Sequence, residues 1–199
     1  MDKTITLFNL MTFVVAILAL LVAGWNMWLS QIRRGHIYLS QPTIFFFGWD
    51  GIGDYTPKIM FRSALFSSGN RGRILESLHL VVKSTGTVSE FPFWGYDDGK
   101  GMVKGSGLFV GSTGHIAYHH FTPGSDDDAF SFSDRKYEIE VWAKLFGKLA
   151  NVKLGHYNFE IPEQSSVLSL SEKEIGIMWN WSPAQRKYSP EISYRPVID

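Results

Sequence analysis

Residues 136–145 are KYEIEVWAKL and alternate between apolar and largely polar side chains along the whole segment. In an extended chain, successive side chains point to opposite faces, so every second residue shares a face. One face then carries Tyr137, Ile139, Val141, Ala143 and Leu145, and the other carries Glu138, Glu140, Trp142 and Lys144. This pattern predicts a β-strand with one dry face and one mostly wet face.

The same period of two recurs on both sides of this segment. Residues 151–161 and 175–181 alternate in the same way, whereas residues 58–66 and 74–82 are apolar on both faces, as in central strands. Shorter candidate strands cover residues 36–39, 43–49, 87–94, 107–110 and 115–121. Clusters of Gly, Asn, Asp and Ser separate most of them, which is typical of turns.

Many short strands without a long amphipathic helix predict an all-β fold. We expect an antiparallel β-sandwich of immunoglobulin-like or jelly-roll-like architecture. The chain has no cysteine, so the Cys…Trp…Cys pattern of true immunoglobulin domains is absent. The prediction therefore concerns the architecture and not a named superfamily.

An uncharged apolar run, residues 5–29, precedes these strands. A membrane-spanning helix needs roughly 20 mostly apolar residues, which this run provides. Trp25 and Trp28 occupy the place of an interfacial aromatic belt, and Arg33 and Arg34 follow where they can reach lipid phosphates. The predicted organisation is a short tail (1–4), a transmembrane helix (5–29), a juxtamembrane segment (30–40) and a β-sandwich domain (41–199).

An apolar run near the N-terminus can also be a cleavable signal peptide or a buried helix of a soluble domain. A cleavable signal peptide has an apolar core of about 7–15 residues and a small-residue cleavage site, and this run is longer and lacks such a site. A buried helix of a soluble domain normally carries a polar stripe, which Asn9, Thr12 and Asn26 are too few to form. We therefore expect a single-pass signal-anchor that contacts the lipid bilayer through residues 5–29.

The orientation follows from the positive charges beside the helix. Lys3 and the α-amine precede it, with Asp2 nearby, whereas Arg33 and Arg34 follow it directly. Lys and Arg near the helix ends favour the cytoplasmic side. This predicts a cytoplasmic C-terminal domain, with a periplasmic or extracellular domain as the alternative.

The composition excludes several classes of function. Without cysteine there is no disulfide framework, no thiolate nucleophile and no cysteine-based zinc site. The formal net charge of zero argues against a nucleic-acid partner, since such proteins normally carry a basic excess. No phosphate-binding loop, dinucleotide fingerprint or nucleophile elbow is present, so we expect no cofactor.

Candidate metal ligands occur in two kinds of segment. His115 and His119 share one face of a predicted strand, but about 13 Å separates them at four residues of roughly 3.3 Å, too far to bind one ion. The imidazoles are expected to lie partly exposed on the sheet surface. The acidic loops offer Asp97, Asp98, Asp126, Asp127 and Asp128 as oxygen ligands, although Asp runs in turns usually hold the backbone.

Arg71 and Arg73 form the sharpest basic feature, in the loop Asn70-Arg71-Gly72-Arg73. In a domain tethered to a bilayer, two arginines on a turn can contact lipid phosphates. The alternative is that they are ordinary hairpin charges that protect a sheet edge or pair with Glu76.

The sequence thus favours a membrane-anchored β-domain that works by binding, as an interaction or accessory module with a protein partner of unknown identity. Rigid strands and loops suit recognition, and the anchor confines the domain to the membrane. A membrane-tethered hydrolase or metal-dependent enzyme that uses His115, His119 and the acidic loops is the competing class. A structural subunit of a larger membrane complex is the third.

Overall fold

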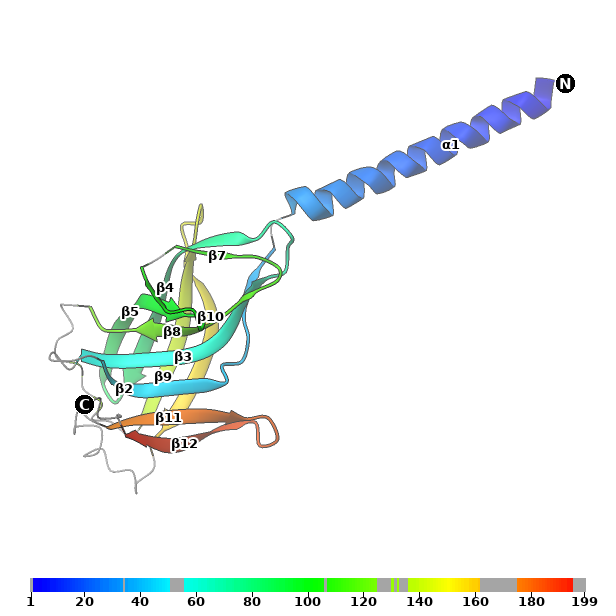
Figure 1. Ribbon diagram of the computed structural model, residues 1–199. Helices are drawn as coiled ribbons and strands as arrows, with labels where there is room; N and C mark the ends of the chain where they lie inside the picture. Colours follow the sequence, from blue (N-terminus) through cyan, green and yellow to red (C-terminus); the bar gives the residue numbers. More distant parts are fainter. Residues whose placement is uncertain are drawn as a thin grey trace.

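The computed structural model describes residues 2–33, 35–50, 56–105, 107–124, 130, 132, 136–161 and 175–194. Helix α1 (Asp2–Met27) continues into the π-helical turn η1 (Trp28–Ile32) and projects away from a β-domain (Figure 1). The strands are β1 (Ile37–Leu39), β2 (Ile44–Asp50), β3 (Thr56–Ser67), β4 (Arg73–Ser84), β5 (Thr87–Asp97), β6 (Met102–Lys104), β7 (Leu108–Val110), β8 (His115–Phe121), β9 (Lys136–Leu145), β10 (Val152–Glu160), β11 (Ile175–Ser182) and β12 (Lys187–Tyr194).

The strands form one antiparallel sheet in the order β10-β9-β4-β5-β8-β3-β2-β11-β12. β1, β6 and β7 add to it by pairing with β3, β5 and β4. β5 changes partner along its length, because residues 87–92 pair with β4 and residues 93–97 pair with β8. A bulge between Phe93 and Gly95 marks the change, and a bulge bends a strand and increases its twist.

The bent sheet closes through side chains rather than through a last ladder of hydrogen bonds. β10 and β12 are the two end strands. The ring centroids of Tyr157 and Phe159 in β10 lie 6.5 and 5.2 Å from that of Tyr188 in β12. The same two rings lie 5.0 and 4.8 Å from Phe45 of β2. The result is a nearly closed, barrel-like sheet around an aromatic interior.

The alternation of β9 decides which side chains enter this interior. Tyr137, Ile139, Val141, Ala143 and Leu145 are all buried, and Lys136 and Lys144 on the other face are exposed. Buried residues of β2, β3 and β4 meet them, including Phe47, Phe61 and Leu80. Burial of large apolar side chains contributes about 1.5–3 kcal/mol each, so this core dominates the stability of the domain.

The predicted all-β fold with one N-terminal apolar helix is confirmed. The predicted strands over residues 136–145 and 115–121 coincide with β9 and β8, and the two segments that are apolar on both faces become the internal strands β3 and β4. β6 and β12 were not predicted. β6 has only three residues, and β12 contains Pro190, which a sheet tolerates because β12 is an end strand.

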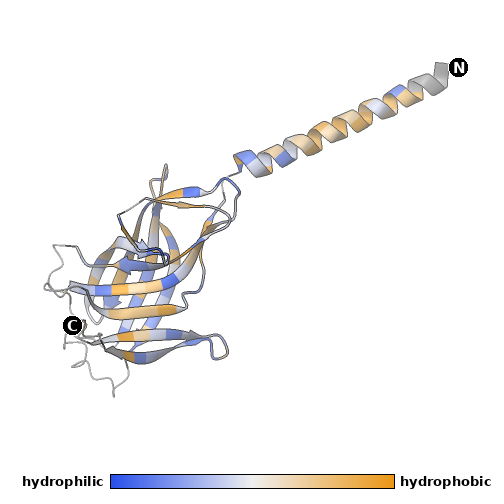
Figure 2. Ribbon diagram, in the orientation of Figure 1, coloured by the Kyte–Doolittle hydropathy of each residue, from blue (hydrophilic) through white to orange (hydrophobic). Residues whose placement is uncertain are grey.

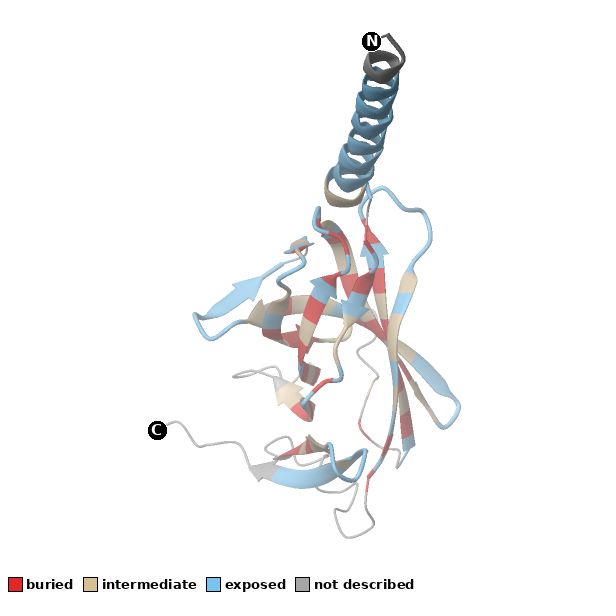
Figure 3. Cartoon of the chain, turned by 90° about the vertical axis from the view of Figure 1, so that its right-hand side faces the viewer, coloured by how far each residue is buried: buried red, intermediate tan, exposed pale blue. Residues whose placement is uncertain are grey.

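The helix is mostly apolar, with a few polar turns along it (Figure 2). Residues 7–28 are all exposed, so no other described part of the chain covers them (Figure 3). Residues Leu7–Ile32 are long and apolar enough to cross a membrane. At 1.5 Å per residue these 26 residues extend about 39 Å, which exceeds the hydrocarbon thickness of about 30 Å.

Val141→Asp should abolish cooperative unfolding of the domain, because an unpaired carboxylate at a fully buried site costs several kcal/mol. Val88→Asp is the matched control, since Val88 is 68% exposed and lies opposite Lys83. We expect the control to change the free energy of unfolding by less than about 0.5 kcal/mol. Urea denaturation in detergent, followed by circular dichroism, checks both, and equal effects would contradict the inward direction of Val141.

Candidate functional site

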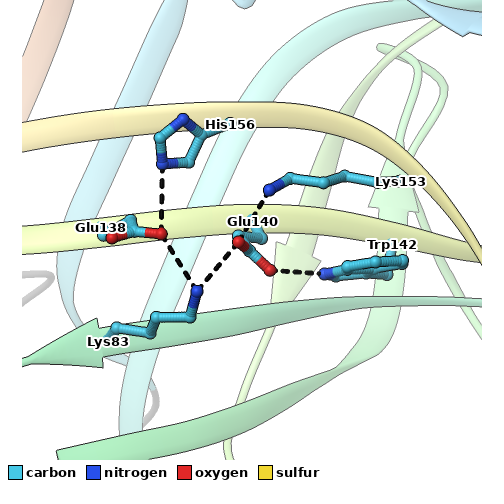
Figure 4. Close-up of polar contacts among 6 residues, drawn as sticks. All are labelled: Lys83, Glu138, Glu140, Trp142, Lys153 and His156. Carbon is cyan, nitrogen blue, oxygen red and sulfur yellow. Dashed lines mark hydrogen bonds and ion pairs between the residues drawn. The ribbon is translucent and has the colours of Figure 1, made fainter.

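The outer face of β4, β9 and β10 carries a connected group of ion pairs (Figure 4). One carboxylate oxygen of Glu140 accepts hydrogen bonds from Lys83 Nζ at 2.9 Å and Lys153 Nζ at 2.7 Å, and the other accepts from Trp142 Nε1 at 2.9 Å. Glu138 Oε1 lies 3.0 Å from Lys83 Nζ and 3.2 Å from His156 Nε2. We call these residues the β9 network: Lys83, Glu138, Glu140, Trp142, Lys153 and His156.

Strand register brings the members of the β9 network together. Lys83 lies directly opposite Glu138 in the β4–β9 pair, and Lys153 and His156 lie opposite Trp142 and Glu140 in the β10–β9 pair. Side chains that face each other across antiparallel strands interact most strongly. The network therefore links three neighbouring strands on the face that points away from the core.

The β9 network keeps its carboxylates ionised. Hydrogen bonds from Lys153, Lys83 and Trp142 lower the pKa of Glu140 to about 2. The hydrogen bond from Lys83 likewise lowers the pKa of Glu138, and bonds to Glu140 and Glu138 raise the pKa of Lys83. Two ammonium groups thus balance two carboxylates at neutral pH. Such an arrangement holds strands in register and presents fixed charges.

An open hollow of about 560 Å³ adjoins the network. Lys83 and Glu138 belong to both, and the other lining residues are Ser84, Thr85, Lys136, Tyr137, Asn158, Phe159 and Glu160. Its lining combines polar side chains of the outer face with the two aromatic rings of Tyr137 and Phe159. Residues 162–174, which follow Ile161 in the chain, lie outside the described residues.

Two of the three histidines of β8, His119 and His120, are buried. His119 is fully buried, so the expectation of a partly exposed imidazole is wrong for this residue, whereas His115 is half-buried as expected. His120 is 7% exposed. His119 packs 5.3 Å from Phe61 and 6.2 Å from Phe93. Burial first, and then His115, lower the pKa of His119 to about 3, which leaves its imidazole neutral at physiological pH.

His115 and His119 were predicted to share one face of the strand, and their packing agrees. Tyr96 lies opposite His119, and the ring centroid of Tyr96 is 4.8 Å from that of His115. His120 points to the other face, towards Trp94. Among the described residues, no three His, Asp or Glu side chains are grouped so that they could hold a metal ion.

The acidic candidates divide into two groups. Asp97 and Asp98 lie at the β5–β6 turn, where their carboxylates accept hydrogen bonds from the backbone N–H groups of Gly99 and Lys100. These are the local Asx contacts typical of turns. Asp126, Asp127 and Asp128 lie outside the described residues.

The basic and interfacial candidates all lie near the junction of helix and domain. Arg71 is exposed in the turn before β4, whereas Arg73 begins β4 and is half-buried. Glu76 pairs with Lys144 at 3.2 Å and not with these arginines. Trp25 and Trp28 stack at 5.5 Å near the end of the helix, and Arg33 follows them. Arg34 lies outside the described residues.

Sequence reasoning did not identify the β9 network. The alternation placed Glu138, Glu140 and Trp142 on one wet face, but their cations come from β4 and β10. Only the register of three strands shows which lysines reach them. An unusual concentration of carboxylates on the central part of one strand was the available signal.

Comparisons with protein-family models, curated proteins and solved structures find no match to this chain.

Glu140→Gln should lower the free energy of unfolding by about 1–3 kcal/mol at neutral pH, because charge-assisted hydrogen bonds from two lysines are lost. The pKa of Glu140 is about 2 in the folded protein against an ordinary value of 4.5. Its stabilisation is therefore complete above pH 4.5 and disappears as the pH falls towards 2. Urea denaturation at a series of pH values should show the difference between wild type and variant shrinking over this range.

Glu160→Gln is the control for that measurement. Glu160 pairs with Lys136 at 3.6 Å, and both side chains are more than half exposed. Exposed pairs contribute less than about 1 kcal/mol. A control that loses as much stability as Glu140→Gln would contradict a special role for the β9 network.

Proposed function

We propose that this protein is a single-pass, membrane-anchored β-domain that acts as a binding or accessory module at the membrane surface. The observation that carries the proposal is the exposed apolar helix α1, which η1 and residues 33–36 connect to β1. An apolar surface of this size on a water-soluble protein would favour aggregation, and a bilayer covers it. The stacked Trp25 and Trp28 support an interfacial position for the end of the helix.

The shifted pKa values support binding rather than acid–base catalysis. A general acid or base works best when its pKa lies near the ambient pH. Here the pKa of Glu140 is about 2, that of His119 about 3 and that of Tyr157 about 12, all far from neutrality. Stoichiometric zinc, manganese or calcium in the purified full chain would contradict this preference and favour the tethered metal-dependent enzyme.

We also propose that the domain faces the cytoplasm. Arg33 and Arg34 follow the helix, whereas Lys3 and the α-amine precede it beside Asp2. The excess of Lys and Arg near the helix ends supports a translocated N-terminus and a cytoplasmic C-terminus.

The double substitution Val15→Arg and Leu18→Arg should release the protein from the membrane. Each charge near the bilayer centre costs about 2.5–3.5 kcal/mol on insertion scales. Carbonate extraction of membranes measures the release, and the control is Val15→Leu with Leu18→Val, which keeps the segment apolar. A double-arginine variant that resists extraction as well as this control would refute the spanning helix.

A reporter fused after Asp199 should behave as cytoplasmic in the wild-type protein. Changing Arg33 and Arg34 to Asn and adding two lysines after Asp2 moves the positive charges to the other side of the helix. The reporter should then be exported. Export in the wild type would overturn the proposed orientation and leave the anchor itself intact.

A further inference from the structure

Several chain segments meet at the end of the domain where α1 joins it. The backbone N–H of Ser68 donates to the carbonyl of His36 at 2.9 Å, and that of Ser67 donates to Gly111 at 3.0 Å. The N–H of Phe146 donates to Ile74 at 3.0 Å, which adds the β9–β10 hairpin to the group. We call this end the helix-proximal rim: residues 66–74, 107–114 and 144–151. β7 and the hairpin tip lie at the end of the domain nearest α1 (Figure 1).

The connection between α1 and the rim is short and tightly packed. A Cβ atom on Gly35 would overlap the backbone of Gly69, so these two backbone segments touch without intervening side chains. His36 N–H also donates to Ser68 Oγ at 2.9 Å. The five residue steps from Ile32 to Ile37 reach at most about 18 Å. The part of the rim at Gly69, which touches Gly35, therefore lies within that distance of the end of the spanning segment.

The rim exposes large apolar side chains. Leu149 is fully exposed, and Phe146 and Phe109 are 67% and 62% exposed. Ile74 lies directly opposite Phe109 in the β4–β7 pair and is 48% exposed. Phe109 also lies over Gly72, whose φ of +66° and lack of a Cβ atom allow the ring to approach. Apolar groups gathered at one end of a domain, outside its core, mark an interaction surface.

The charges of the rim are all positive. Its residues include Arg71, Arg73, Lys144 and Lys148 but no Asp or Glu, although the whole chain has equal numbers of basic and acidic residues. Lys144 pairs with Glu76. Arg71 and Lys148 are exposed, and no ion pair with another described residue neutralises them. Exposed cations between apolar tips complement an anionic lipid surface.

We propose that the helix-proximal rim is a second membrane contact, in which Leu149 and Phe146 insert at the bilayer interface and Arg71 and Lys148 bind anionic headgroups. This rests on the proposed function, because α1 must hold the domain at a membrane. The bilayer fits better than a protein partner. The tether reaches at most about 18 Å, and a headgroup layer takes up about 6 Å of it. The remaining space is little wider than one helix, whose diameter is about 10 Å. The rim thereby orients the domain and directs its opposite end away from the lipid.

Nitroxide labels on single cysteines test this in the full chain, which contains no native cysteine. The labelled variants are Leu18→Cys in α1, Leu149→Cys at the rim and Val88→Cys at the opposite end of β4 and β5, each reconstituted into nanodiscs of phosphatidylcholine with phosphatidylglycerol. Collision rates with oxygen and with a water-soluble nickel complex report depth. We expect a several-fold higher oxygen-to-nickel ratio at 18 and 149 than at 88.

The labels separate the two proposals. A lipid-exposed label at 18 with a water-exposed label at 149 would overturn the rim contact and leave the anchor standing. A water-exposed label at 18 would overturn both. A label at 149 shielded from oxygen and nickel alike would indicate that protein, such as a second copy, covers the rim, and this too would overturn the proposal.

The role of charge is tested with the label at 149. Arg71→Gln with Lys148→Gln, or nanodiscs of phosphatidylcholine alone, should lower the oxygen-to-nickel ratio at 149 several-fold. Arg186→Gln with Lys187→Gln removes two exposed cations from the β11–β12 turn and should leave the ratio unchanged. A ratio that none of these changes alters would overturn the binding of headgroups by Arg71 and Lys148.

Discussion

The fold depends on the aromatic contacts that hold its two end strands together. Phe45 of β2 lies at the centre, with ring centroids 5.2 Å from Phe61, 5.0 Å from Tyr157, 4.8 Å from Phe159 and 5.5 Å from Tyr188. These rings come from β3, β10 and β12, so one side chain joins strands from both ends of the sheet. Tilted and edge-on ring pairs add about 0.5–1.5 kcal/mol each beyond their buried area. Aromatic packing thus compensates for the missing ladder between β10 and β12.

Closure of the sheet also fixes what the outer face can carry. With the interior filled by rings, the alternation of β9 forces Glu138 and Glu140 outward, where Lys83 and Lys153 meet them from the neighbouring strands. A one-residue slip would turn both carboxylates into the core. The β9 network and the aromatic interior therefore specify the same register, one by charge and the other by burial.

Most strands could be predicted from the sequence, but the pairing of strands in the sheet could not. Alternation located β8 and β9 with their observed bounds, because period two is a local property. It could not show which face of β8 is internal, since Ala117 and Phe121 on one face compete with Ile116 and Tyr118 on the other. His119 consequently proved to be buried. The β9 network and the rim were hidden for the same reason, because both are assembled from segments that only strand pairing brings together.

A formal net charge of zero conceals an uneven distribution of charge along the molecule. The rim, where α1 enters the domain, contains four cations and no carboxylate of its own, whereas the cations of the β9 network are matched by carboxylates. A neutral chain has little long-range attraction to an anionic surface, but under the proposed membrane contact α1 holds the rim close to the lipid and removes the need for one. Cations that reach the headgroups are only weakly screened there, because screening becomes strong only beyond a Debye length of about 8 Å. In the proposed arrangement the anchor and the charge asymmetry are complementary, since the first supplies proximity and the second supplies orientation.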